Sequence, residues 1–149
     1  MSVPNEADFA LIKMGDGATP TEVFTAICGI EGVSINETAN TNDRFRRDCA
    51  KPGIPGVRKV RVVGKQLDVS GTGAVDKANI ASFRSALGVS KNYKVELYKA
   101  DGTDAGVLYG TYAGAFVLTT SNMSLDPNAD TTGEINLASD GTITWTAAA

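Results

Sequence analysis

The sequence has no histidine and only two cysteines, Cys28 and Cys49, in 149 residues. Histidine is the commonest general base and metal ligand, so proton transfer and zinc binding both lack their usual residue. Two cysteines are too few for a disulfide scaffold, and their spacing fits no zinc site. They are either free thiols or a Cys28–Cys49 bridge. A cytoplasmic origin favours the thiols, whereas an assembly exposed to air permits the bridge.

Long apolar runs and catalytic motifs are also missing. No apolar run approaches the ~18 residues that cross a bilayer, and the N-terminus lacks the pattern of a secretory signal. These absences predict a protein that is kept or assembled in the cytoplasm and has no membrane partner. The sequence contains no HExxH, GxSxG, P-loop or CxxC motif. We therefore expect no catalytic residue, no metal site, no cofactor and no enzymatic activity.

The composition fits one β-rich domain. Sixteen glycines and 7% aromatic residues are typical of a chain with many turns, and 149 residues suit a single core. We expect an arm at residues 1–7 and one domain at 8–149, with a helix at 76–87. The expected strands span 8–14, 22–36, 57–70, 92–99, 106–121, 132–138 and 142–146. This order predicts a mainly β fold, a β-sandwich or open barrel with one packed α-helix.

The strand at 57–70 has a polar and an apolar face. Val60 and Val62 occupy even-numbered positions, whereas Leu67 and Val69 occupy odd-numbered ones, so a regular strand would place the two pairs on opposite faces. A bulge at Gly64 would place all four side chains on one face. The opposite face then carries Lys59, Arg61, Gln66, Asp68 and Ser70.

Residues 38–56 follow no period, and we interpret them as one long loop between strands, a length that is often functional. Basic residues cluster in this loop and the strand after it, whereas no lysine or arginine follows Lys99. The cluster is either a solvated surface, a nucleic-acid contact, or a surface for self-association with an acidic patch of another copy. Phe45 and Ile54 among these charges favour self-association. The cluster comprises Arg44, Arg46, Arg47, Lys51, Arg58, Lys59, Arg61 and Lys65.

Three stretches, taken in order, resemble the major tail tube proteins of siphophages and gene transfer agents. They are AICGIEGVSINETANTNDRFRRDCAKPG, VRKVRVVGKQLDVSGTG and GTYAGAFVLTTSNMSLDPNADTTGEINLASDGTITW. The resemblance implies a structural virion protein of the tail. Six copies would form a ring whose inner sheets join into one barrel, and rings would stack into a tube. The implied partners are other copies, the tail-tip, tape-measure and tail-terminator proteins, and phage DNA that passes without specific binding.

The resemblance also implies roles for individual residues. The loop at 38–56 matches the inter-ring loop, with contacts by Arg44, Phe45, Arg46, Arg47, Asp48 and Lys51. Residues 1–7 match a mobile arm, and the lumen candidates are Gln66, Asp68, Glu134 and Asn136. Lys59 and Arg61 share the polar face of the lumen candidates, so we expect them near the loop, paired with acids of a neighbouring ring. The alternative function is a β-sandwich binding or decoration module on a virion or cell surface.

Overall fold

The computed structural model describes residues 7–148, which form eight β-strands and one α-helix. All paired strands are antiparallel, in the order β2-β1-β5-β6-β7-β4-β3, and β8 pairs with β6. The predicted mainly β fold with one helix is confirmed, whereas the arm expected at 1–7 lies, apart from Ala7, outside the described residues. The elements are β1 (Phe9–Gly15), β2 (Phe24–Ala26), β3 (Ile30–Arg46), β4 (Val57–Ala74), α1 (Lys77–Ala86), β5 (Ser90–Lys99), β6 (Val107–Ser124), β7 (Thr132–Ser139) and β8 (Thr144–Ala147).

The core lies inside the curl of the sheet. β1 and β5 contribute Ile12, Tyr93 and Val95 from one half, and β4, β6 and β7 supply the other side. A Cβ added to Gly71 on β4 would come within 3.2 Å of Ile12 on β1, so these two strands, which are not neighbours in the sheet, face each other across the core. The rings of Tyr93 and Phe116 meet edge to face at its centre, with centroids 6.1 Å apart.

The helix begins and ends where its sequence predicts. The side chain of Asp76 accepts a hydrogen bond from the backbone N–H of Ala78, which caps the first turn. Phe83 and Ala86 on the inner side are buried in the core. Gly88, at a φ of 76°, follows the last turn and takes a left-handed conformation that favours glycine.

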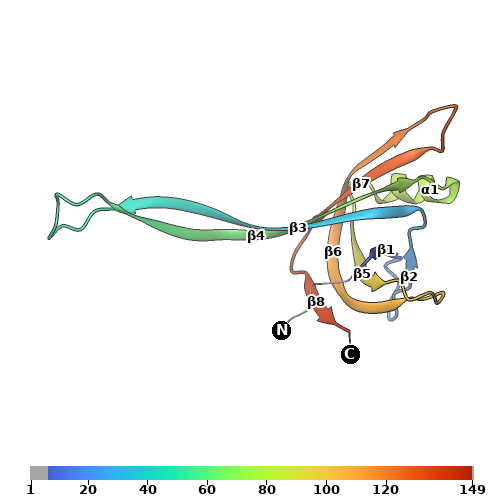
Figure 1. Ribbon diagram of the computed structural model, residues 1–149, viewed down its shortest axis with the longest axis horizontal. Coiled ribbons are helices and arrows are strands. Elements are labelled where there is room, and N and C mark those ends of the chain that lie inside the picture. The colour runs from blue at the N-terminus through green and yellow to red at the C-terminus, as the bar shows by residue number, and fades with distance from the viewer. Residues whose placement is uncertain (1–6, 149) are drawn as a thin grey trace.

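The β3–β4 hairpin extends far beyond the rest of the fold (Figure 1). Its register runs from Ile30 opposite Gly73 to Arg46 opposite Val57, with one irregularity between Ile30 and Gly32 and another between Asn40 and Thr41. The second irregularity leaves Val63 as an extra residue on β4, beside the bulge position predicted at Gly64. No residue between Asn36 and Gln66 is buried, so this outer hairpin has no core beneath either face.

The expected loop at 38–56 is therefore wrong over its first half. β3 continues to Arg46, and only residues 47–56 connect the two strands. Both prolines and both glycines of the segment fall in that connection, at Pro52, Gly53, Pro55 and Gly56. The strand part has no apolar period because both of its faces are exposed in the single subunit.

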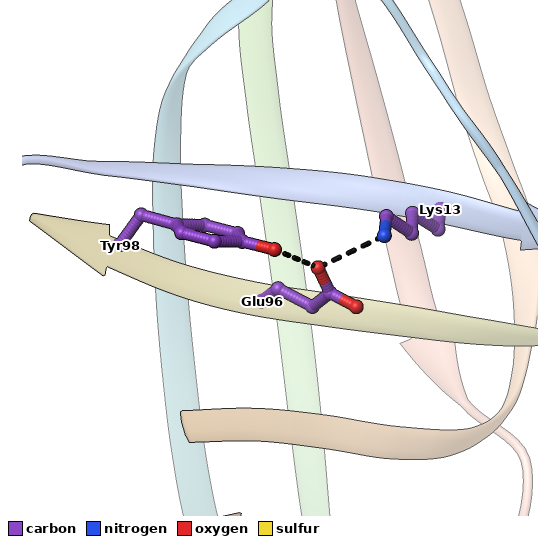
Figure 2. Close-up of polar contacts among 3 residues, drawn as sticks. All are labelled: Lys13, Glu96 and Tyr98. Atoms are coloured by element: carbon purple, nitrogen blue, oxygen red, sulfur yellow. Dashed lines mark hydrogen bonds and ion pairs between the residues drawn. The ribbon is translucent and has the colours of Figure 1, made fainter. Parts of the chain in front are cut away.

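A polar cluster fastens β1 to β5 on the side away from the core. Lys13 Nζ on β1 lies 3.0 Å from Glu96 Oε2 on β5, and the same oxygen accepts a hydrogen bond from the Tyr98 hydroxyl (Figure 2). The hydrogen bond to Glu96, together with partial burial, raises the pKa of Tyr98 to about 12. Burial in the core raises the pKa of Tyr93 to about 12 as well.

Replacing Glu96 with Gln is expected to lower the pKa of Tyr98 towards its ordinary value of about 10, because the phenolate would no longer face a carboxylate. Because the pKa of Tyr98 is higher in the folded protein than in the unfolded chain, Tyr98 contributes to stability below a pH of about 10. This contribution disappears as the pH rises towards 12. Phenolate absorbance during alkaline titration measures the change for one of the four tyrosines. The step of Tyr93 should stay in place and serves as the internal control. Identical titration curves for both proteins would contradict the assignment.

Candidate functional site

The outer hairpin has a basic face. Residues directly opposite each other on paired strands share a face, and residues two apart on one strand do so too. Arg44 lies opposite Lys59, Asn42 opposite Arg61, and Arg46 opposite Val57. The side chains of Arg44, Arg46, Lys59 and Arg61 therefore form one surface, which we call the basic face. All four are exposed, and none forms an ion pair with another residue of the described chain.

The opposite side of the hairpin, here called the apolar face, has a different chemistry. Phe45, 72% exposed, lies opposite Arg58, and Val60 lies opposite Asp43. Arg58 Nη2 lies 2.8 Å from Asp43 Oδ2, so the charge of Arg58 is paired. The face thus combines exposed apolar side chains with a neutralised ion pair, whereas the basic face carries unpaired cations.

The six predicted inter-ring residues all lie at the outer end of the hairpin and are all exposed. Arg44 and Arg46 are on the basic face, Phe45 is on the apolar face, and the other three are in the connection. Asp48 accepts a hydrogen bond from the backbone N–H of Ala50, which stabilises the turn. The structure therefore brings these residues to one end but divides them between two faces. Those in the connection are Arg47, Asp48 and Lys51.

The four lumen candidates share one solvent-exposed face of the sheet. Ser70 lies opposite Asn136 and Thr72 opposite Glu134, and both are on the side of β4 that also carries Gln66 and Asp68. Gln66 Oε1 accepts a hydrogen bond from Asn40, and Gln66 Nε2 donates one to Asp68 at 3.0 Å. The intervening Leu67, Val69, Ile135 and Leu137 are buried on the other side. We call this surface the polar face.

The polar face and the basic face are continuous. Asn36, Thr38, Asn40, Asn42 and Arg44 follow one another at every second position of β3. Lys59 and Arg61 therefore share the face of the lumen candidates but lie towards the tip of the hairpin, as expected.

Charge changes sign along the length of the molecule. The connection between β6 and β7 lies at the end opposite the hairpin tip (Figure 1), and it carries the exposed Asp126 and Asp130. Glu134 follows at the start of β7, and Asp68 lies farther along the polar face. One subunit thus carries an acidic connection at one end and the basic face at the other.

Besides β2 and β8, which each pair with one strand only, two strands beside the polar face have unpaired edges. β3 pairs only with β4 among residues 7–148. β6 pairs with β5 over residues 107–117, whereas β7 and β8 pair along its other side, so Thr119–Ser124 of β6 lacks a strand partner towards β5 in the described chain. Because β3, β4, β7 and β6 alternate in direction, the β3 edge and the β6 edge point in opposite directions. Neither edge was predicted, since strand pairing is not evident from local sequence.

The two cysteines lie far apart. Both thiols are free and exposed. Cys28 precedes β3 and Cys49 follows it, and a strand of 17 residues spans about 50 Å. The bridge considered above is therefore absent, since a disulfide requires Cα atoms within ~7 Å.

The remaining features are a hollow in the surface, the placement of potential metal-ligating side chains, and the apolarity of the helix. A hollow of about 630 Å³ lies at the root of the hairpin, lined by Glu37, Lys65, Ser139 and Ile143 among others. Over residues 7–148, no three potential metal-ligating side chains come together. In the same part of the chain, no helix has the length and apolarity needed to span a membrane.

Comparison with known proteins finds solved structures of similar fold. No family model matches the chain, and no curated protein does. The tail of an empty gene transfer agent particle, with C6 symmetry, has a TM-score of 0.61 at 19% identity over 99% of this chain and 100% of that chain. The chain has the tail tube fold. The tail tube of SPP1 matches with a TM-score of 0.60 at 11% identity, covering 99% of this chain and 80% of that one.

The tail tube fold also extends to contractile systems. A chain of the sheath-tube complex of an extracellular contractile injection system matches with a TM-score of 0.64 at 16% identity, covering 99% and 95% of the two chains. Both the sheet and the long hairpin of this protein therefore fall within the matched region, which leaves almost no part of the chain outside the fold.

Proposed function

We propose that this chain is a structural subunit of a phage-type tail, in which six copies form a ring and the rings stack into a tube. The observation that carries the proposal is the pair of unpaired edges. The strands β6, β7, β4 and β3 expose one polar face, and their outer edges run in opposite directions. A β3 edge of one copy can therefore add to the β6 edge of the next as another antiparallel strand, and closure of the ring leaves neither of these two edges free. The six-fold symmetry of the gene transfer agent tail supports six copies.

In this ring the polar face lines the channel. Asp68 and Glu134 would repel the phosphates of phage DNA, and Gln66 and Asn136 offer neutral hydrogen-bonding groups. DNA then passes without specific binding. The buried side chains beneath this face hold the wall in shape, so the role is mechanical and electrostatic rather than enzymatic.

The outer hairpin then reaches beyond its own ring. Arg44, Phe45, Arg46, Arg47, Asp48 and Lys51 would contact the neighbouring ring. Tail-tip, tape-measure and tail-terminator proteins would complete the assembly, with the subunit made in the host cytoplasm and found in the virion tail. No membrane partner and no cofactor are required.

Negative-stain electron microscopy of the purified protein over a concentration series tests the proposal. We expect hollow rings or stacked tubes, with a channel wide enough for duplex DNA, because both edges become paired only on assembly. A particle that stays monomeric at every concentration, even with a tail-tip complex as initiator, would contradict the proposal. If such a monomer bound glycans, a decoration module would be favoured instead.

A further inference from the structure

The basic face is electrostatically unfavourable in an isolated subunit. Arg44 and Lys59 lie directly opposite each other, and like charges in this position destabilise a strand pair. Arg61 and Arg46 lie on the same surface, one pair away on either side. No carboxylate of the described chain pairs with any of the four. A two-stranded ribbon without a core is marginal by itself, so this arrangement calls for an anionic partner.

A surface of opposite charge exists at the other end of the same chain. Asp126 and Asp130, here called the acidic end, are exposed and form no ion pair with another residue between 7 and 148. Met123 and Leu125 beside them are 49% and 72% exposed. Phe45 and Val57, 72% and 66% exposed, lie beside the cations at the hairpin tip. Both ends therefore combine charge with exposed apolar side chains.

We propose that the basic face docks onto the acidic end of a second copy in the next ring, an inference that rests on the proposed function. The two surfaces lie at opposite ends of the molecule (Figure 1), so one subunit cannot pair them with each other. A head-to-tail contact of this kind repeats from copy to copy and builds a filament. The chain carries 14 basic and 17 acidic residues, so every copy supplies charges of both signs for such a contact.

A second copy fits better than nucleic acid. Each stacked subunit supplies both halves of the contact in equal number, and the apolar side chains at both ends can pack together only against protein. Nucleic-acid phosphates would neutralise the cations but leave the acidic end and Leu125 exposed. The docking also sets the direction of growth, because only opposite ends are complementary.

A charge swap within one chain tests the docking. The hairpin variant Arg44→Glu/Lys59→Glu should still form rings, but the protein concentration needed for tube growth should rise at least about tenfold, because like charges would meet at the contact. Adding Asp126→Lys/Asp130→Lys to that variant should restore growth. The matched control adds Asp104→Lys/Asp140→Lys, two exposed acids away from the acidic end, and should not restore it. Ring mass by sedimentation and tube length by electron microscopy are the readouts.

The outcomes separate the docking from the function itself. Normal tubes from the hairpin variant, or equal rescue by the control, would overturn the docking while leaving the tube in place. Normal tubes combined with lost binding of a short DNA duplex would assign the basic face to phosphates instead. Failure of the unaltered protein to form rings or tubes, even with a tail-tip complex as initiator, would overturn the proposed function. Tube growth of the unaltered protein should also weaken when the salt concentration rises from about 0.1 M to about 1 M, because the Debye length falls from ~10 to ~3 Å. Tube growth that does not respond to salt would contradict an electrostatic contact.

Discussion

A subunit without its outer hairpin is expected to fold normally and to lose tube growth completely. The design removes residues 40–64 and joins Ala39 to Lys65, which lie opposite each other, through an Asn-Gly turn. Every buried core residue lies outside the removed segment. The free energy of unfolding should therefore change by no more than about 1 kcal/mol, as for other changes at exposed sites. Single rings should remain, because the β6 edge and the inner part of β3 are intact.

Urea unfolding and electron microscopy of the shortened protein measure the two effects separately. The control is Gly64→Ala in the complete hairpin, where an added Cβ meets nothing within 4 Å; it should grow tubes as the unaltered protein does. Tubes of normal length from the shortened chain would show that stacking does not use the hairpin. A large loss of stability would show that the hairpin supports the core, against its exposure on both faces.

Local sequence predicted the parts of the fold in which side chains alternate between core and solvent. The helix could be placed by its cap at Asp76 and by its apolar stripe ending near Leu87, and the structure agrees. The polar face could be predicted from the parity of Lys59, Arg61, Gln66 and Asp68 across a bulge, and the register confirms that they share a side. Each of these features depends on neighbours within a few positions.

The features that sequence did not predict depend on distant partners or on their absence. Residues 38–46 form a strand, but no burial gives them a period, so composition alone favoured a loop. The role of Gly110 on β6 is similarly hidden: a Cβ there would collide with the ring of Trp145 on β8. The unpaired edges of β3 and β6 follow only from the full strand order, which no local pattern contains.

The second large effect concerns the core and separates folding from assembly. Phe116 has no exposed surface and packs edge-on against Tyr93, so Phe116→Ala should lower the free energy of unfolding by about 3–5 kcal/mol. That is a large share of the 5–15 kcal/mol that typically stabilises a domain. Val60→Ala removes a smaller apolar side chain from the apolar face, where Val60 is 51% exposed, and should change the same quantity by less than about 0.5 kcal/mol. Denaturant unfolding of both variants measures the difference.

Measurements of tube growth distinguish a defect in folding from a defect in the contact between rings. Phe116→Ala should reduce assembly only in proportion to the unfolded fraction, so lowering the temperature or the denaturant concentration should restore it. Val60→Ala should leave the monomer intact, so any loss of tubes would come from the contact between rings. A loss below about 1 kcal/mol for Phe116→Ala would contradict a core inside the curl of the sheet. A loss of several kcal/mol for Val60→Ala would contradict the view that exposed apolar side chains on the hairpin serve assembly rather than folding.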